Sequence, residues 1–131
     1  MITQIHSVAI VISDYDRAMQ FYCDTLGFEV TADISDPNNP DNRWLTLRPN
    51  GAQTNIMLLR PSPRLSDLSP PLGKPTIVIE TDDLDAACER IKSGGGRVTT
   101  PPKRAGWGAA MEAHFADPDG NVFLLIQRME N

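Results

Sequence analysis

The sequence predicts an α+β fold built from two consecutive copies of one βαβββ unit. Strand-like and helix-like hydrophobic patterns follow one another in the same order in both halves of the 131-residue chain. Aligning Asp16 with Asp85 also aligns Ala18 with Ala87, at the start of the helix-like pattern in each half. A proline-rich segment separates the halves. These observations indicate a duplicated unit within a single domain.

The first half begins with an alternating, β-branched run over residues 5–12, which predicts a strand. A helix is expected to begin at Asp14, because apolar side chains then recur at helical spacing, and to end at Gly27. The turn-rich insert SDPNNPDN and the hairpin sequence PNGAQ separate the strands that follow. These strands are expected over residues 28–32, 43–48 and 54–60.

The second half repeats this order, with a strand over 76–81 and a helix that begins at Asp83 and ends at the sequence SGGG. Its remaining strands are expected over residues 97–100, 107–116 and 122–127. A tight turn is expected over 117–120, since Pro118 presets one backbone angle and Gly120 accepts a positive φ. The proline-rich segment is typical of a stiff, exposed linker. The first module, the linker and the second module therefore cover residues 1–60, 61–74 and 75–131.

Composition and charge argue against several classes of function. A formal net charge of −5 disfavours binding to nucleic acid, which needs a basic surface, and to an anionic membrane. No apolar run approaches the roughly 18 residues that cross a bilayer, and the first residues lack the basic segment of a signal peptide. Cys23 and Cys88 fall in helix-like stretches and are expected to be reduced thiols. We therefore expect a cytoplasmic protein.

Two sequence motifs point to a known family. The predicted first helix ends in FYCDTLGF, and the hairpin DPDGN leads directly into the strand VFLLIQ. With these motifs at their separation in a duplicated chain, the sequence resembles the vicinal-oxygen-chelate superfamily of glyoxalases, bleomycin-resistance proteins and extradiol dioxygenases over essentially its whole length. The resemblance implies two modules whose sheets curl into open, barrel-like cups, with helices outside and the ligand inside. It also implies a homodimer, with each cup formed within one chain or across two.

The resemblance also locates the positions of a metal site. In metal-bearing relatives, inward positions on the first, fourth, fifth and last strands commonly hold His, Glu, His and Glu. Counting from the helix starts and from the DPDG turn carries these positions over to Ser7, Leu58, Thr76 and Leu124. None of these residues is a usual ligand of a catalytic divalent ion. We therefore expect no metal and no cofactor, which argues against glyoxalase I or dioxygenase activity.

His6 lies next to the first of these positions. Because strand side chains alternate between faces, His6 is expected to point at the outer helices rather than into the cup. A β-bulge would change its direction, but the other ligands would still be missing.

The same alternation predicts which residues line the cup. Ser7 faces inward, as do Trp44 and Thr46 on the third strand, because Leu45 and Leu47 suit the helix side. The remaining predicted lining includes Ile56, Leu58, Thr76 and Leu124. An apolar lining with a few hydroxyl groups is typical of a small-molecule pocket, and such residues also fill small closed barrels.

Two tryptophans are candidates for ligand contact. Trp44 offers an aromatic face to a planar ligand, and it is equally suited to a core or a dimer contact. Trp107 lies in the glycine-flanked sequence RAGWGAA, where a lid over the mouth of the cup is expected.

His114 is the candidate catalytic residue, because imidazole acts as an acid or base near neutral pH. Glu80 and Glu112 are its possible partners. A metal enzyme that uses these same residues as relocated ligands is a further alternative.

These observations favour a binding protein over an enzyme. The leading hypothesis is a metal-independent protein that holds a hydrophobic or aromatic small molecule, as in antibiotic or natural-product resistance by sequestration. The alternative is a metal-independent isomerase or lyase that uses His114 and a glutamate. A domain with a collapsed, empty cup is the remaining possibility.

Overall fold

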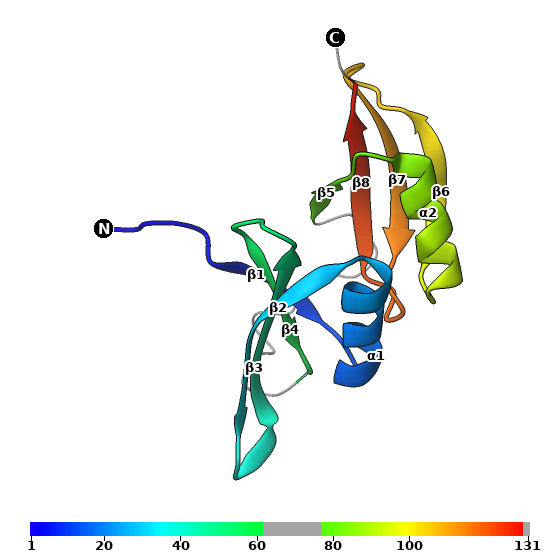
Figure 1. The fold of residues 1–131 in the computed structure, drawn as a ribbon. Helices are drawn as coiled ribbons and strands as arrows, with labels where there is room; N and C mark the ends of the chain where they lie inside the picture. Colours follow the sequence, from blue (N-terminus) through cyan, green and yellow to red (C-terminus); the bar gives the residue numbers. More distant parts are fainter. Residues whose placement is uncertain (62–76, 130–131) are drawn as a thin grey trace. The chain divides into compact units, whose positions relative to one another are not determined.

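The computed structural model of the chain describes residues 1–61 and 77–129. Two compact units make up the chain, unit 1 (Met1–Pro70) and unit 2 (Pro71–Asn131). Each unit contains a mixed, open sheet with a helix beside it (Figure 1). The predicted linker lies outside the described residues except for Pro61.

Unit 1 follows the predicted βαβββ order. Its elements are β1 (Ser7–Val11), α1 (Tyr15–Met19), the π-helix η1 (Gln20–Thr25), β2 (Phe28–Asp36), β3 (Asn39–Pro49) and β4 (Asn55–Leu59). The four strands form a sheet in the order β1-β4-β3-β2. Strands β1 and β4 are parallel, and the other neighbouring pairs are antiparallel.

Unit 2 repeats this topology. Its elements are β5 (Val78–Glu80), α2 (Leu84–Ser93), β6 (Arg97–Arg104), β7 (Ala110–Ala116) and β8 (Val122–Arg128). The sheet order, β5-β8-β7-β6, is that of unit 1 when corresponding strands are compared. The predicted α+β fold with two βαβββ modules is therefore confirmed.

The first helix changes type midway. Asp14 caps its N-terminus by accepting hydrogen bonds from the backbone N–H groups of Asp16 and Arg17. After Met19 the helix continues as η1, in which the consecutive residues Phe21 and Tyr22 are both buried. A wider π-helical turn changes the angle between successive side chains, and here two adjacent aromatic rings enter the core. The helix ends at Thr25, with Leu26 as its C-cap, and Gly27 follows at φ 80°, as the sequence predicts.

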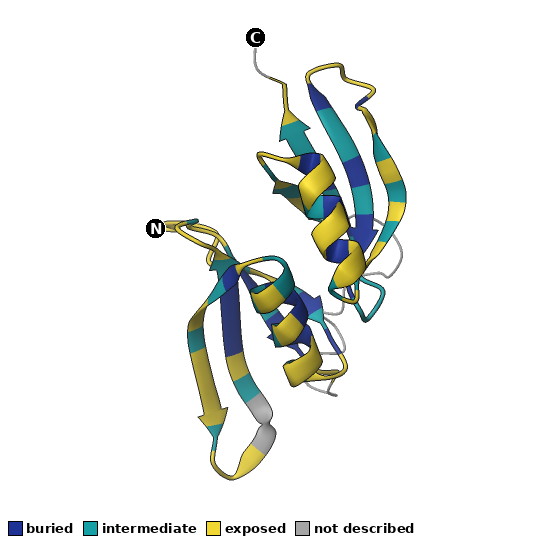
Figure 2. Cartoon of the chain, turned by 45° about the vertical axis from the view of Figure 1, so that its right-hand side comes forward, coloured by how far each residue is buried: buried dark blue, intermediate teal, exposed yellow. Residues whose placement is uncertain are grey.

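The core of unit 1 lies between this helix and one face of the sheet (Figure 2). Tyr22 packs on Phe28, with ring centroids 5.9 Å apart. On the same face, the Arg43 guanidinium lies 4.7 Å from the ring centroid of Tyr15 in α1. The buried apolar side chains of β1, β3 and β4 that share this face are Ile10, Leu45, Leu47, Ile56 and Leu58.

The core of unit 2 is built in the same way. Phe115 of β7 and Phe123 of β8 stack with ring centroids 5.0 Å apart. Gln127, also on β8, accepts a hydrogen bond from the Leu84 backbone N–H at the start of α2. Phe123 and Gln127 therefore lie on the helix side of the sheet, because alternate strand residues share a face.

Strands β2, β3, β6 and β7 differ in extent from the sequence prediction. Strands β2 and β3 continue through most of the turn-rich insert, so the hairpin between them is longer than expected. Strand β6 continues through Pro101 and Pro102, which a sheet tolerates because β6 is an edge strand. Strand β7 begins only at Ala110, so Trp107 lies in the preceding loop. No helix in the described residues is long and apolar enough to cross a membrane.

Candidate functional site

The sheet face of each unit that lies opposite its helix is called the open face. Its residues in unit 1 follow from strand register, because paired residues share a face. Ser7 pairs with Asn55, and Ala9 pairs with Met57, which in turn pairs with Thr46. The open face of unit 1 therefore contains Ser7, Ala9 and Val11 from β1, Asn55, Met57 and Leu59 from β4, and Trp44, Thr46 and Arg48 from β3.

Two predicted lining residues lie on the other face. Leu58 pairs with Ile10, and Ile56 pairs with Val8 and Leu47, so both point to the helix side of the sheet. Leu58 is fully buried there. The predicted placement of Ile56 and Leu58 in the cup is therefore wrong by one residue. The error arises because β4 is an interior strand with the sequence NIMLL, in which apolar residues on both faces remove the usual alternation.

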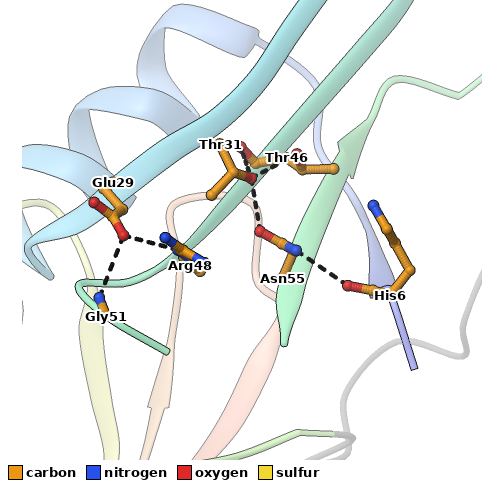
Figure 3. Close-up of polar contacts among 7 residues, drawn as sticks. All are labelled: His6, Glu29, Thr31, Thr46, Arg48, Gly51 and Asn55. Atoms are coloured by element: carbon orange, nitrogen blue, oxygen red, sulfur yellow. Dashed lines mark hydrogen bonds and ion pairs between the residues drawn. The ribbon is translucent and has the colours of Figure 1, made fainter. Parts of the chain in front are cut away.

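A connected set of polar groups crosses the open face of unit 1 (Figure 3). The Thr31 hydroxyl lies 2.7 Å from the hydroxyl of Thr46 and 2.6 Å from Oδ1 of Asn55. Asn55 Nδ2 donates to the backbone carbonyl of His6 at 3.2 Å. Thr31 reaches this network because it lies at a β-bulge between Val30 and Ala32. The network joins β2, β3 and β4 to the segment that leads into β1.

An ion pair extends this polar region. Arg48 Nε donates to Oε1 of Glu29 at 2.7 Å, and the Gly51 backbone N–H donates to the same oxygen at 3.3 Å. These two hydrogen bonds, that of Arg48 first, lower the pKa of Glu29 from its ordinary value. Arg48 and Glu29 are paired residues on neighbouring strands (Figure 3).

The His6 ring does not point at the helices. It lies beside the Trp44 ring, with centroids 5.8 Å apart, and its Nδ1 is 3.1 Å from the Ser7 hydroxyl. Trp44 shares the open face with Thr46, so His6 also lies on that side. The alternation rule does not apply to His6, because β1 begins only at Ser7. The Trp44 side chain remains 44% exposed.

The open face of unit 2 carries the candidate catalytic histidine. His114 pairs with Leu124, which pairs with Val78 on β5. The His114 Nδ1 lies 3.3 Å from the hydroxyl of Thr100, its partner on β6. Ile126 of β8 pairs with Glu112 on β7 and with Glu80 on β5, so both glutamates lie on this face.

The carboxylates near His114 have different surroundings. Glu80 forms an ion pair with Arg128 on β8. Glu112 pairs with Lys103 on β6 and is half-buried. His114 and Glu112 are therefore two titratable groups on one face of β7, which is the arrangement that the acid–base hypothesis requires.

Two of the predicted site residues, Thr76 and Trp107, remain. Thr76 falls outside the described residues. Trp107 lies in the loop between β6 and β7 and is 61% exposed.

The residues at the expected metal positions do not fit a catalytic divalent ion. Of the four expected positions, Ser7 and Leu124 lie on the open faces, Leu58 lies on the helix side of β4, and Thr76 falls outside the described residues. A hydroxyl and alkyl groups do not make the His and carboxylate donor set that such an ion prefers, and neither do the amide of Asn55 and the thioether of Met57 on the open face of β4. Over residues 1–61 and 77–129, no group of three or more His, Cys, Asp or Glu side chains is arranged to hold a metal ion.

Sequence reasoning missed two polar members of this site. Asn55 is the polar residue in an otherwise apolar strand, which is a signal that could have identified it. Thr31 depends on the bulge in β2, for which the sequence contains no local signal.

Comparisons with known proteins agree with this architecture. Residues 4–125 match the model of the Glyoxalase/Bleomycin resistance protein/Dioxygenase superfamily. The uncharacterized protein YetH of Bacillus subtilis is 34% identical over 95% of this chain and 98% of its own length. The lactoylglutathione lyase of Salmonella typhimurium is 27% identical over 88% of this chain and 86% of its own length.

Solved structures show the same fold. A superfamily member from Sphaerobacter thermophilus aligns with a TM-score of 0.80 and 38% identity, over 97% of this chain and 98% of its own. TnmS3, an antibiotic binding protein from Streptomyces sp. CB03234, aligns with a TM-score of 0.78 and 34% identity, over 98% of both chains.

Proposed function

Because this chain belongs to the glyoxalase/bleomycin resistance protein/dioxygenase superfamily, we propose that it binds a hydrophobic or aromatic small molecule without a metal. The sequestration of an antibiotic or another natural product is the concrete form of this proposal. Sequestration needs affinity and no chemistry, so it does not require the family's metal ligands.

The observation that carries the proposal is the composition of the open face of unit 1. Trp44, Met57 and Val11 supply aromatic and aliphatic surface, while Asn55 supplies a polar group that the partly buried Thr31–Thr46 contact holds in place. This combination of apolar area with a small number of orienting hydrogen-bonding groups is typical of small-molecule sites. The half-exposed Trp44 ring offers the largest flat contact.

The similarity to TnmS3 supports the same proposal. That protein is described as antibiotic binding, and the alignment covers almost all of both chains. For this chain, we infer sequestration of a ligand of the same broad class.

The test is to incubate the full-length protein with a panel of aromatic antibiotics that includes bleomycin. Bound compound is separated from free compound by equilibrium dialysis, released by denaturation and identified by mass spectrometry. We expect at least one compound to be retained stoichiometrically and released with unchanged mass. Catalytic conversion of a retained compound would overturn sequestration.

A second candidate function is a metal-independent isomerase or lyase. The specific observation in its favour is that His114 and Glu112 share the open face of unit 2, with His114 held by Thr100. The similarity to a lactoylglutathione lyase is compatible with an enzyme of this general class. His114→Ala should abolish turnover in that case, whereas a pure binding protein would show no turnover to lose.

Two further properties are proposed on the basis of family membership and composition. We expect a homodimer, and the free thiols Cys23 and Cys88 are consistent with a cytoplasmic location.

A further inference from the structure

The hydrogen-bond network on the open face of unit 1 has a definite direction. The backbone carbonyl of His6 can only accept a hydrogen bond, so the Asn55 atom that faces it must be Nδ2. Asn55 Oδ1 is consequently the atom that lies 2.6 Å from the Thr31 hydroxyl. Since a carbonyl oxygen also only accepts, Thr31 is the donor in that contact.

The direction then extends to Thr46. A threonine hydroxyl has one proton, and the Thr31 proton is directed to Asn55. In the 2.7 Å contact between the hydroxyls, Thr46 must therefore donate to Thr31. The hydrogen bonds run from Thr46 to Thr31, from Thr31 to Asn55, and from Asn55 to the His6 carbonyl. The Thr46 side chain is almost completely buried, so this order is held by the sheet itself.

The network determines what Asn55 can offer to a ligand. Its Oδ1 already accepts from Thr31, and one proton of its Nδ2 is donated to His6. Within residues 1–61 and 77–129 its second Nδ2 proton has no acceptor, so it is available to a bound molecule. Asn55 therefore acts towards a ligand as a hydrogen-bond donor, although the amide of a freely rotating asparagine could offer either group.

One neighbouring side chain, that of Arg48, shares this donor character. Asn55 pairs with Ser7, and continuing the β3–β4 register by one residue places Arg48 opposite Asn55. The Arg48 guanidinium contains only donors, and its Nε is bound by Glu29. We call Ser7, Asn55, Arg48 and Glu29 the polar row, because these residues cross the sheet side by side.

Aromatic surface lies next to the polar row. The His6 and Trp44 rings lie on the same face with their centroids 5.8 Å apart, and the His6 Nδ1 is 3.1 Å from the hydroxyl of Ser7 in the polar row. A planar molecule that contacts these rings would bring a substituent within reach of the polar row.

We propose that Asn55 is a specificity-determining residue that selects aromatic ligands with a hydrogen-bond acceptor, such as a carbonyl oxygen, over isosteric ligands without one. This inference rests on the proposed binding function and adds the chemical class of the ligand. A site whose polar groups are already oriented rejects an analogue that leaves them unpaired, because the buried donor then loses its hydrogen bond to water without replacement.

The test uses two probes of the same shape, acetylnaphthalene and isopropenylnaphthalene, which differ in having C=O or C=CH₂. Binding to the full-length protein is measured by titration calorimetry or by quenching of tryptophan fluorescence. We expect the wild type to bind acetylnaphthalene about tenfold more tightly, as one hydrogen bond of ordinary strength predicts. Equal affinities for the two probes would overturn the inference and leave the proposed function intact.

Asn55→Asp tests the role of the donor. The aspartate keeps the acceptor for Thr31 and nearly the same shape, but it has no N–H group to donate, either to a ligand or to the His6 carbonyl. We expect the preference for acetylnaphthalene to disappear, so that the ratio of the two affinities falls to about one. Asn50→Asp introduces the same charge in the exposed turn after β3 and should preserve the preference.

Thr31→Val provides an independent test that leaves Asn55 in place. Loss of the Thr31 hydroxyl removes one of the two contacts that orient the amide, so the ratio of the two affinities should fall even though the donor is still present. An unchanged ratio in both Asn55→Asp and Thr31→Val would contradict the inference. Failure of both probes to bind the wild type would overturn the proposed aromatic-binding function itself.

Discussion

At the scale of single residues, adjacent side chains along β3 of unit 1 lie on opposite faces of the sheet, one in the core and the other at the proposed binding surface. Leu45 and Leu47 are completely buried on the helix side of β3, whereas Trp44 on the open face is 44% exposed. The open face can therefore vary in chemistry without loss of the core. Because alternate residues of a strand point to opposite faces, residues that stabilise the core and residues proposed to bind a ligand are neighbours in the sequence.

This separation predicts different effects for two adjacent substitutions. Leu45→Ala should lower the free energy of unfolding by about 2–5 kcal/mol, because it leaves a cavity in the core. Trp44→Ala should lower it by about 1 kcal/mol or less, since the side chain is partly exposed, but should weaken binding of aromatic compounds. Urea unfolding and calorimetric titration of both variants measure the two effects. Equal destabilisation by both substitutions would contradict the assignment of faces.

The ion pair of Asp33 and Arg43 predicts a pH dependence. Arg43 donates from Nε and Nη2 to the two carboxylate oxygens at 2.8 Å, and these hydrogen bonds lower the pKa of Asp33. The contribution is present above the unfolded-state value of about 3.9 and is lost as pH falls through the lower folded-state value. Because the pair is partly exposed, it stabilises the fold by about 1 kcal/mol at most.

Asp33→Asn should therefore be less stable than the wild type at neutral pH. The difference in the free energy of unfolding should shrink as the pH falls below the pKa of an ordinary aspartate. Thermal unfolding of both proteins over a pH series measures this difference directly. Comparison with the variant removes the effects of other carboxylates, such as Glu29. A difference that does not change with pH would show that the ion pair does not lower the pKa of Asp33 in the folded protein.

At the scale of secondary-structure elements, side-chain caps start both helices. Asp14 and Asp83 occupy corresponding positions, and each accepts hydrogen bonds from backbone N–H groups of the first turn. The sequence indicates both starts because aspartate before an amphipathic stretch is a typical N-cap. The difference between the helices lies further along, where α1 changes into a π-helix and α2 does not.

Removal of one cap gives an element-scale prediction. Asp83→Ala should cost about 1 kcal/mol, since the Ala86 N–H loses its acceptor. Asp82→Ala, one residue earlier, removes the same charge without removing the cap and should cost clearly less. The free energies of unfolding of both variants can be compared by urea denaturation. An equal loss in the two variants would indicate a general charge effect instead of capping.

At the scale of the whole molecule, the two units share topology but differ in the chemistry of their open faces. Unit 1 presents the polar row beside aromatic rings, and unit 2 presents His114 and Glu112 among aliphatic residues. A duplicated scaffold can therefore provide two kinds of surface. This difference is the reason that binding and acid–base chemistry are assigned to separate units in the two functional hypotheses.

The proposed dimer is the molecular-scale prediction. Sedimentation equilibrium of the full-length protein should give twice the mass of one chain, with little dependence on concentration in the micromolar range. A stable monomer under these conditions would contradict the proposal. Measurement with and without a retained aromatic compound would also show whether ligand binding and assembly are coupled.

The sequence is enough to predict the order of elements and the helix starts. It also predicts that Trp44 and Leu45 lie on opposite faces. Local capping, turn residues and the alternation in β1 and β3 carry this information, because each acts over a few residues. The tertiary structure alone decided which face β4 presents, that Thr31 joins Thr46 and Asn55, and where the His6 ring lies. The physical reason is that an interior strand with apolar residues on both faces takes its register from its neighbours. The bulge at Thr31 and the ring contact of His6 likewise depend on strands that are distant in sequence.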